Sequence, residues 1–163
     1  MLSFSDYQNE ISKAIKSCDN EKLNLFCHDV VSRILPFVDR ADNSELYESE
    51  IEILKILRQE AQKDTIDPAL VGKYLDNLSK IVEEDEAHGL DMNGCIVEFL
   101  CALDNWKCFN ETGSKAAVAA VSENLMNILD FNFVEDVSLK SWLTVPEINT
   151  EFNKQILYLR NNL

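Results

Sequence analysis

The sequence is poor in glycine, histidine and basic residues. Of its 163 residues only four are Gly and two are His, and 15 Lys and Arg stand against 29 Asp and Glu, a formal net charge of −14. Nucleic-acid binding needs a basic footprint, so this charge argues against a nucleic-acid partner and against anionic membrane surfaces, and it allows a basic partner. Four glycines cannot build the usual phosphate-binding loops, and neither GxxxxGK[ST] nor GxGxxG occurs.

The motifs of metal and nucleophilic catalysis are missing too. A di-iron bundle needs two E-x-x-H motifs, and the nearest match is a single Asp85-x-x-His88. Cys27 and His28 are adjacent on a predicted helix, where neighbouring side chains do not face each other, so they do not form a nucleophile–base pair. The sequence therefore predicts no cofactor, no metal site and no enzyme. An enzyme that uses carboxylates and Mg²⁺ stays open as an alternative, which saturable Mg²⁺ binding would reveal.

The chain lacks a secretory signal and a membrane-spanning run. Its start, MLSFSDYQNEISKAIK, has no apolar stretch behind a basic one, and no apolar run approaches the ~20 residues of a membrane helix. The five cysteines form no C-x-x-C pair and are odd in number, which is typical of buried free thiols in a reducing compartment. They are Cys18, Cys27, Cys95, Cys101 and Cys108. The sequence predicts a cytoplasmic protein.

Apolar residues recur at helical spacings almost throughout the chain. The pattern predicts seven helices, over about residues 4–18, 20–35, 46–61, 68–88, 91–106, 115–129 and 146–163, and no strand. It indicates one all-α domain, residues 1–163, built as a bundle of about seven antiparallel helices. Ala116, Ala117, Ala119 and Ala120 let another helix approach closely, which predicts a central position for that helix.

Local signals predict where several helices begin and end. Asp67-Pro68 and Ser114 are capping signals, Asp19 or Asn20 caps the second helix, and Pro36 is expected to kink or end it. Capping boxes are expected at Ser5 with Gln8 and at Thr144 with Glu147, and Pro146 is expected at the first position of the last helix.

The negative charge is concentrated in one third of the chain. Residues 39–91 contain 6 basic and 15 acidic side chains, net −9 of the total −14. Four of the acids end a predicted helix, where they oppose its dipole at a cost of about 0.3–1 kcal/mol each. Solubility alone would not place them there, so a docking surface for a basic partner stands beside a merely solvated face as an interpretation. The candidate partner-binding carboxylates are Glu45, Glu48, Glu52, Glu83, Glu84, Asp85, Glu86 and Asp91.

The two tryptophans have different surroundings in the sequence. Trp106 lies on an apolar helical stripe and is expected in the core. Trp142 lies in the least helical stretch, residues 131–143, in which Ser138–Leu143 is expected to form one short helical turn. Trp142 either fills the core from a loop or anchors a partner, and it is therefore included among the candidate partner-binding residues.

The last helix carries a resemblance to a known family. Pro146–Leu157 reads P-x-hydrophobic-x-x-E-x-x-x-Q followed by two apolar residues, with Glu151 and Gln155 at the polar positions. Together with Glu98–Trp106 and Ala116–Leu129, it resembles small acidic all-helical bacterial proteins among the immunity proteins of polymorphic toxin and contact-dependent growth inhibition systems. The resemblance covers the C-terminal half and carries nothing about residues 1–90.

The resemblance implies a non-catalytic function. An immunity protein binds a toxic domain in a one-to-one complex, and the toxic domain is often a nuclease with a basic active site. The resemblance implies no interface residues, and Glu151 and Gln155, four positions apart, are expected only to hydrogen-bond each other. The alternative is a helical adaptor or regulatory module whose acidic face only solubilises it and whose partner docks through an apolar groove, with Trp142 nearby.

Overall fold

A computed structural model describes residues 3–84, 93–135 and 139–161 of the chain. Within these residues it contains seven α-helices, one 3₁₀ helix and no strand, which confirms the all-α fold. The elements are α1 (Phe4–Lys16), α2 (Asn20–Asp39), α3 (Glu48–Ala61), α4 (Pro68–Glu84), α6 (Gly94–Thr112), α7 (Lys115–Phe133), η1 (Leu139–Thr144) and α8 (Pro146–Arg160). No helix in the described part is long and apolar enough to cross a membrane.

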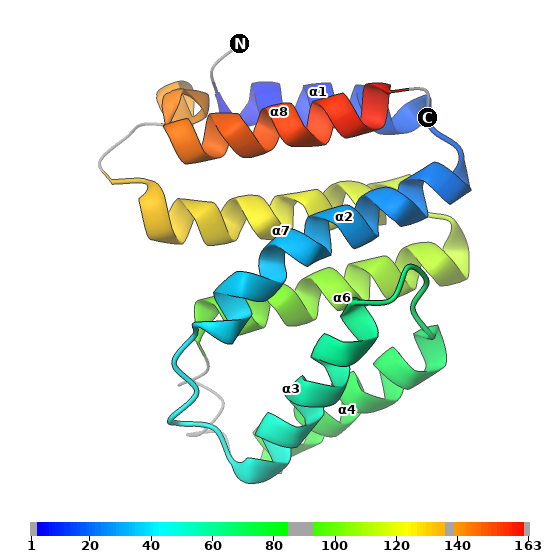
Figure 1. Cartoon of the computed structure of the whole chain (residues 1–163), viewed down its shortest axis with the longest axis vertical. Helices are drawn as coiled ribbons and strands as arrows, with labels where there is room; N and C mark the ends of the chain where they lie inside the picture. Colours follow the sequence, from blue (N-terminus) through cyan, green and yellow to red (C-terminus); the bar gives the residue numbers. More distant parts are fainter. Residues whose placement is uncertain (1–2, 85–92, 136–138, 162–163) are drawn as a thin grey trace.

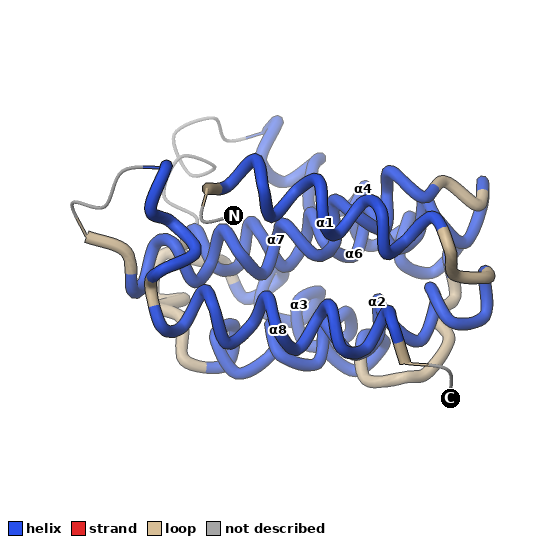
Figure 2. The backbone as a smooth tube through the Cα atoms, turned by 90° about the horizontal axis from the view of Figure 1, so that it is seen from above, coloured by secondary structure: helices blue, strands red, loops and turns tan. Residues whose placement is uncertain are grey.

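The helices form two layers (Figures 1 and 2). One layer contains α1, α7, α6 and α4 side by side, and the other contains α8, α2 and α3. Helix α2 lies across α6 and α7, and α7 packs against α1, α2, α6 and α8. The central position predicted for the alanine-rich helix is therefore confirmed. Of its four alanines, Ala117 is buried, Ala119 and Ala120 are half-buried and Ala116 is exposed.

Local signals place some helix starts correctly. The Asp67 carboxylate accepts the Leu70 N–H and Pro68 is the first residue of α4, while the Ser114 hydroxyl accepts the Ala117 N–H at the start of α7. Asp19, one of the two residues considered, caps α2. These caps are recognisable because donor and acceptor lie within three residues of each other.

Other helix ends differ from the prediction. The capping box of α1 joins Ser3 and Asp6 instead of Ser5 and Gln8. Pro146 is the first residue of α8, as predicted, and the N-cap position before it is Val145. Val145 makes no side-chain cap, so the capping box predicted at Thr144 with Glu147 is wrong. The Thr144 hydroxyl donates to the Ser141 carbonyl instead.

Several helix boundaries differ from the prediction, and one of them is the end of α6, which continues to Thr112 beyond the expected end at 106. Helix α2 continues past Pro36 to Asp39, because the proline removes only one helical hydrogen bond and the buried Val38 beyond it holds the last turn against the core. Helix α6 begins at Gly94 with Asn93 as its cap; Asp91, the expected start, lies outside the described residues. Helix α7 extends to Phe133, beyond the expected end at 129.

The core is built on large side chains from both layers. Tyr7, Phe26, Phe99 and Trp106 are completely buried, which confirms the core position predicted for Trp106.

Helix α6 ends at a glycine. Gly113, the residue after its last turn, adopts φ 71°, a left-handed conformation that glycine adopts without strain and that ends the helix.

The cysteines divide into two groups. Cys18 and Cys27 are buried and Cys95 is partly buried, as expected of free thiols on apolar helix faces. Cys101 and Cys108 are exposed, which corrects the expectation of burial for these two. They are seven positions apart on α6 and so share one face of it, turned away from the core.

Candidate interaction surfaces

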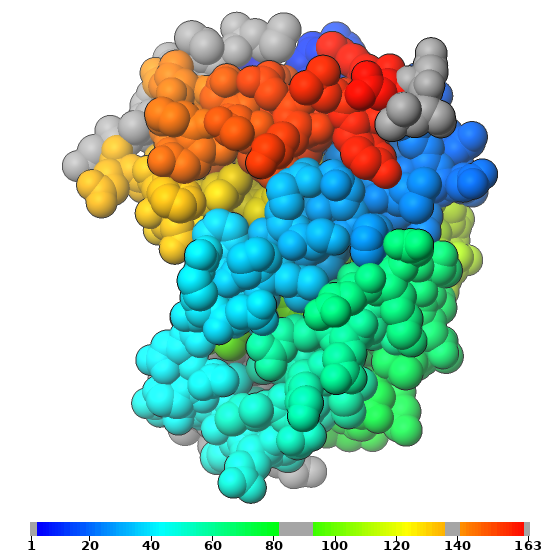
Figure 3. Space-filling model, in the orientation of Figure 1, coloured from blue at the N-terminus to red at the C-terminus, as the bar shows by residue number. Residues whose placement is uncertain are grey.

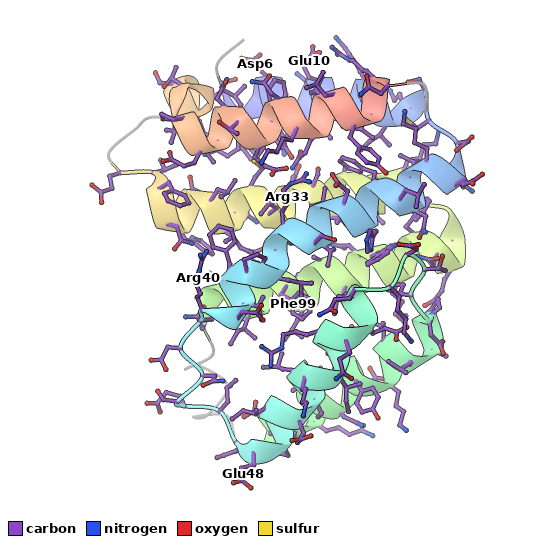
Figure 4. All side chains as sticks on the ribbon, viewed as in Figure 1. Asp6, Glu10, Arg33, Arg40, Glu48 and Phe99 are labelled. Atoms are coloured by element: carbon purple, nitrogen blue, oxygen red, sulfur yellow. The ribbon has the colours of Figure 1, made fainter. Side chains whose placement is uncertain are left out.

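The first candidate surface is the acidic end, which we define as Glu45, Glu48 and Glu52. Glu45 lies in the turn before α3, and Glu48 and Glu52 lie one helical turn apart on α3; all three are exposed. Glu48 lies at the far end of the molecule from α1 and α8 (Figure 4). None of the three forms an ion pair with a cation of the described residues. All three are therefore exposed at the beginning of α3 or in the turn before it.

The other predicted carboxylates are not placed. Asp85, Glu86 and Asp91 lie outside the described residues, as does His88. Glu83 and Glu84 end α4, and their side chains are outside the described part. Helices α3 and α4 pack as a hairpin, which brings the first turn of α3 and the last turn of α4 to the same end of the molecule (Figure 1).

Two acidic side chains of residues 39–91, Glu50 and Glu60, are buried and stabilise local backbone structure. Glu50 is fully buried, and its Oε1 accepts the Tyr47 N–H at the start of α3. Glu60 is 3% exposed, and its carboxylate accepts the Asp67 N–H at 2.8 Å and pairs with Lys63 at 2.7 Å. Glu50 therefore fixes the start of α3 and Glu60 fixes the connection from α3 to α4. The negative charge of residues 39–91 is not all surface charge.

Trp142 belongs to the core. It is 2% exposed, its ring packs edge-on against Phe4 with centroids 5.0 Å apart, and its Nε1–H donates to the Asp130 carboxylate at 2.9 Å. The short helical turn expected around it is confirmed as η1. Of the two roles considered for Trp142, the structure places it in the first, filling the core, and it is not part of an exposed surface.

The second candidate surface is a groove between α2 and α8. The two helices diverge towards the C-terminal end of α2, and α7 forms the floor between them, as the space-filling view shows (Figure 3). The groove has a volume of about 510 Å³. Its apolar lining consists of Pro36, Phe37, Leu125, Leu129, Phe133 and Pro146. We call this surface the α2–α8 groove.

An ion pair joins the two walls of the groove. Arg33 of α2 donates from Nε to Glu151 Oε1 at 2.7 Å and from Nη2 to Glu151 Oε2 at 2.9 Å, and a third bond reaches Asp29 at 2.6 Å. Burial alone would lower the pKa of Arg33, but the hydrogen bonds and charges of Glu151 and Asp29 raise it above its ordinary value. Arg33 therefore stays charged and fixes the distance between α2 and α8 (Figure 4).

The open end of the groove is aromatic. Phe37 and Phe133 line both the groove and a neighbouring hollow of about 450 Å³. Phe133 is 43% exposed. Arg40 lines the hollow with its guanidinium 5.2 Å from the centre of the Phe37 ring, and Lys154 lines the groove on α8.

The polar residues of the C-terminal motif connect different helices. Glu151 binds Arg33, while Gln155 Oε1 accepts a hydrogen bond from the Tyr7 hydroxyl of α1 at 2.8 Å. Their expected mutual hydrogen bond is therefore wrong, because each side chain has a partner on another helix. Gln155 is fully buried, and its Nε2 has no hydrogen-bond partner among the described residues. Both motif residues hold α8 in place.

The described residues contain no cluster of potential metal ligands. No three His, Cys, Asp or Glu side chains among them lie close enough together to hold a metal ion. Cys27 is fully buried and burial raises the pKa of its thiol, while the neighbouring His28 turns its Nδ1 to the Lys63 carbonyl at 2.9 Å. The Cys27 thiol and the His28 ring therefore lie in different surroundings, as their adjacent positions on a helix predict.

The sequence alone did not reveal the groove. Its residues come from three helices, and its opening depends on the angle between α2 and α8. The sequence offers one signal for it, the aromatic Phe133 in a stretch with weak helical periodicity, and this side chain is 43% exposed. No protein-family model, curated protein or solved structure matches the chain.

Proposed function

We propose that this chain is a non-catalytic protein-binding domain that neutralises a basic toxin domain in the bacterial cytoplasm. The toxin domain is a nuclease, and the chain covers its active site in a one-to-one complex through the acidic end. The observation that carries the proposal is the exposure of Glu45, Glu48 and Glu52 without ion-pair partners among the described residues.

Such a surface suits a nuclease because the groove that holds nucleic-acid phosphates is basic. Carboxylates grouped on one surface speed the encounter with such a groove and reject acidic partners. The sequence resemblance of the C-terminal half to immunity proteins supports the same function.

The test is a charge reversal with a matched control. The triple variant Glu45→Lys, Glu48→Lys and Glu52→Lys changes the net charge from −14 to −14 + 6 = −8. The control carries the same reversal at Glu21, Asp104 and Glu135, which are exposed on other helices or loops. The proposed function predicts that a large secreted protein with a C-terminal toxin domain is encoded beside this chain. That toxin domain, expressed in bacteria together with each variant, is the probe.

We expect the wild type and the control to protect growth and the triple variant to lose protection. We also expect the wild-type Kd to rise steeply with salt and the Kd of the triple variant to depend on it less. Equal protection by both variants, or salt-independent binding, would exclude the acidic end as the docking surface.

A second candidate function is favoured by the α2–α8 groove. In this case the chain is a helical adaptor that binds a partner through apolar contacts, and the acidic end only keeps it soluble. An apolar interface persists at high salt, where an acidic interface loosens. Partner capture at about 1 M salt, where the Debye length is about 3 Å, therefore separates the two functions.

A further inference from the structure

We propose that Asn93 is a site of spontaneous deamidation and that the first turn of α6 controls its rate. This modification is independent of the function proposed above. Asn93-Gly94 is the only Asn-Gly pair in the chain. Asparagine reacts most readily in such a pair, because glycine has no Cβ atom to shield its backbone nitrogen from the side chain before it. Asn93 is half-buried and Gly94 is exposed.

The reaction needs only these two residues and water. The backbone nitrogen of Gly94 attacks Cγ of Asn93 and loses its proton, while the side-chain amide leaves as ammonia. Water then opens the resulting five-membered succinimide at one of its two carbonyl groups. One opening gives aspartate, and the other gives isoaspartate, in which the main chain runs through Cβ and Cγ. In sum, asparagine and water give aspartate or isoaspartate and ammonia, without a change of oxidation state.

The attacking nitrogen lies at an accessible place in the fold. Gly94 is the first residue of α6, so its N–H has no acceptor within the helix and the attack breaks no helical hydrogen bond. Asn93 lines the hollow of about 450 Å³ that Phe133 and Arg40 also line, so water reaches its side chain from this hollow.

The cap of α6 nevertheless holds the reacting atoms apart. Ring closure needs the Gly94 nitrogen beside Cβ of Asn93, but Asn93 has ψ 137°, which turns that nitrogen away. Cys95 N–H donates to Asn93 Oδ1 at 2.8 Å, and Val97 N–H donates to the Asn93 carbonyl at 3.0 Å. The Phe131 ring lies against Gly94, where an added Cβ atom would be 3.3 Å from its Cε2. Deamidation therefore requires the first turn to open, and its rate follows the population of the open turn.

The two products have different effects on α6. Aspartate caps helices as well as asparagine does, and its charge is favourable at a helix N-terminus, so α6 keeps its start. Isoaspartate lengthens the main chain by one methylene and moves the free carboxylate to Cα, so the cap geometry is lost. Either product changes the net charge from −14 to −15 beside the hollow that Arg40 and Asp42 line.

The first experiment compares the folded with the unfolded chain. The full chain is incubated at neutral pH with and without denaturing urea, and mass spectrometry of digests detects the gain of about 1 Da at each asparagine. In urea we expect Asn93 to react faster than Asn43, which precedes a serine in an exposed loop. In the folded chain we expect Asn93 to react about ten to a hundred times more slowly than in urea, giving both products.

Three results of this comparison would overturn the proposal. Asn93 that reacts no faster than Asn43 in urea would remove the site. Asn93 that stays intact in the folded chain over an incubation long enough for the slower expected rate would remove it as well. Equal rates with and without urea would remove the control by the first turn.

The second experiment changes the opening of the first turn without altering the reacting pair. Phe131→Ala removes the ring that lies against Gly94, and Leu157→Ala on α8 is the matched control, because the two side chains are 61% and 60% exposed. We expect Phe131→Ala to accelerate deamidation of Asn93 in the folded chain by at least about threefold and to leave the rate in urea unchanged. Leu157→Ala should change neither rate.

Hydrogen exchange of the Cys95 and Val97 amides in the same variants measures the opening itself. Phe131→Ala should accelerate exchange and deamidation by the same factor, because both start from the open turn. Equal deamidation rates in all three folded chains, or faster deamidation without faster exchange, would overturn the control by the first turn.

Discussion

The hydroxyl of Tyr7 donates a hydrogen bond to Gln155 across 148 positions of sequence. The same hydroxyl lies 3.1 Å from Ser122 Oγ, whose own proton goes to the Ala119 carbonyl at 2.6 Å. One buried phenol therefore connects α1 with α7 and α8. Phe152 and Trp142 pack around its ring, with centroids 5.9 and 5.6 Å away.

Removing this hydroxyl should destabilise the fold without disturbing its packing. Tyr7→Phe keeps the ring contacts but leaves the Gln155 amide and Ser122 without their shared partner, so we expect a loss of about 1–3 kcal/mol in the free energy of unfolding. Urea denaturation measures the change. Tyr158→Phe, on a partly exposed tyrosine, is the control and should cost far less; an equal cost would contradict the role of the Tyr7 hydroxyl.

The Arg33–Glu151 pair should be more important for stability than the exposed ion pairs. Glu151 is 5% exposed, so Glu151→Gln leaves the guanidinium with only Asp29, and we expect a loss of about 2–4 kcal/mol. The double variant Arg33→Met with Glu151→Met removes both charges and should be less destabilised. Arg58→Met, which breaks the exposed Arg58–Asp39 pair, is the control and should cost about 1 kcal/mol or less. A double variant as unstable as Glu151→Gln would show that the unpaired charge is not the cause.

Stability should fall as the pH rises above the ordinary thiol pKa of 9.0. Burial raises the pKa of the Cys27 thiol and of the Tyr7 phenol, so both groups keep their protons in the folded chain at a pH where the unfolded chain has lost them. The unfolded state then binds fewer protons, and the free energy of unfolding decreases with rising pH. Urea denaturation at several alkaline pH values measures the slope. Cys27→Ala should flatten it and the exposed Cys108→Ala should not; a slope unaffected by Cys27→Ala would assign it to other groups.

The five cysteines should react with alkylating reagents in a fixed order. Cys101 and Cys108 are exposed and should be labelled first in the folded protein, whereas Cys18 and Cys27 should react only after unfolding. Labelling of Cys101 should accelerate with rising pH, because its partial burial and the charges of Glu98 and Asp104 raise its pKa. Mass spectrometry after timed alkylation identifies each site. Early labelling of Cys27 in the folded chain would contradict its burial.

The sequence predicted the features that depend on neighbouring residues. The helical periodicity gave the all-α class, and the caps at Asp67 and Ser114 were identified because each acts within three residues. The exposure of Glu48 and Glu52 likewise follows from their polar face on α3. Each of these properties is decided before the helices pack.

The features that the sequence did not predict depend on distant partners. The spacing of Glu151 and Gln155 predicts a bond between them, but Glu151 binds Arg33, which lies 118 positions away in the sequence. Glu60 is buried because it caps the connection to α4, and Pro36 stays inside α2 because the core holds the turn beyond it. The groove belongs to the same class, since the angle between α2 and α8 is set by packing on α7.

The central position of α7 has a consequence for synthesis of the chain. The apolar faces of α1 and α2 emerge from the ribosome first, but the helix that both of them cover is made after α6. Until residue 133 has been added, Phe26 and its neighbours on α2 have no complete surface to bury against. The core of such a chain can be completed only after α7 has been made, and until then the apolar faces of α1 and α2 are open to aggregation.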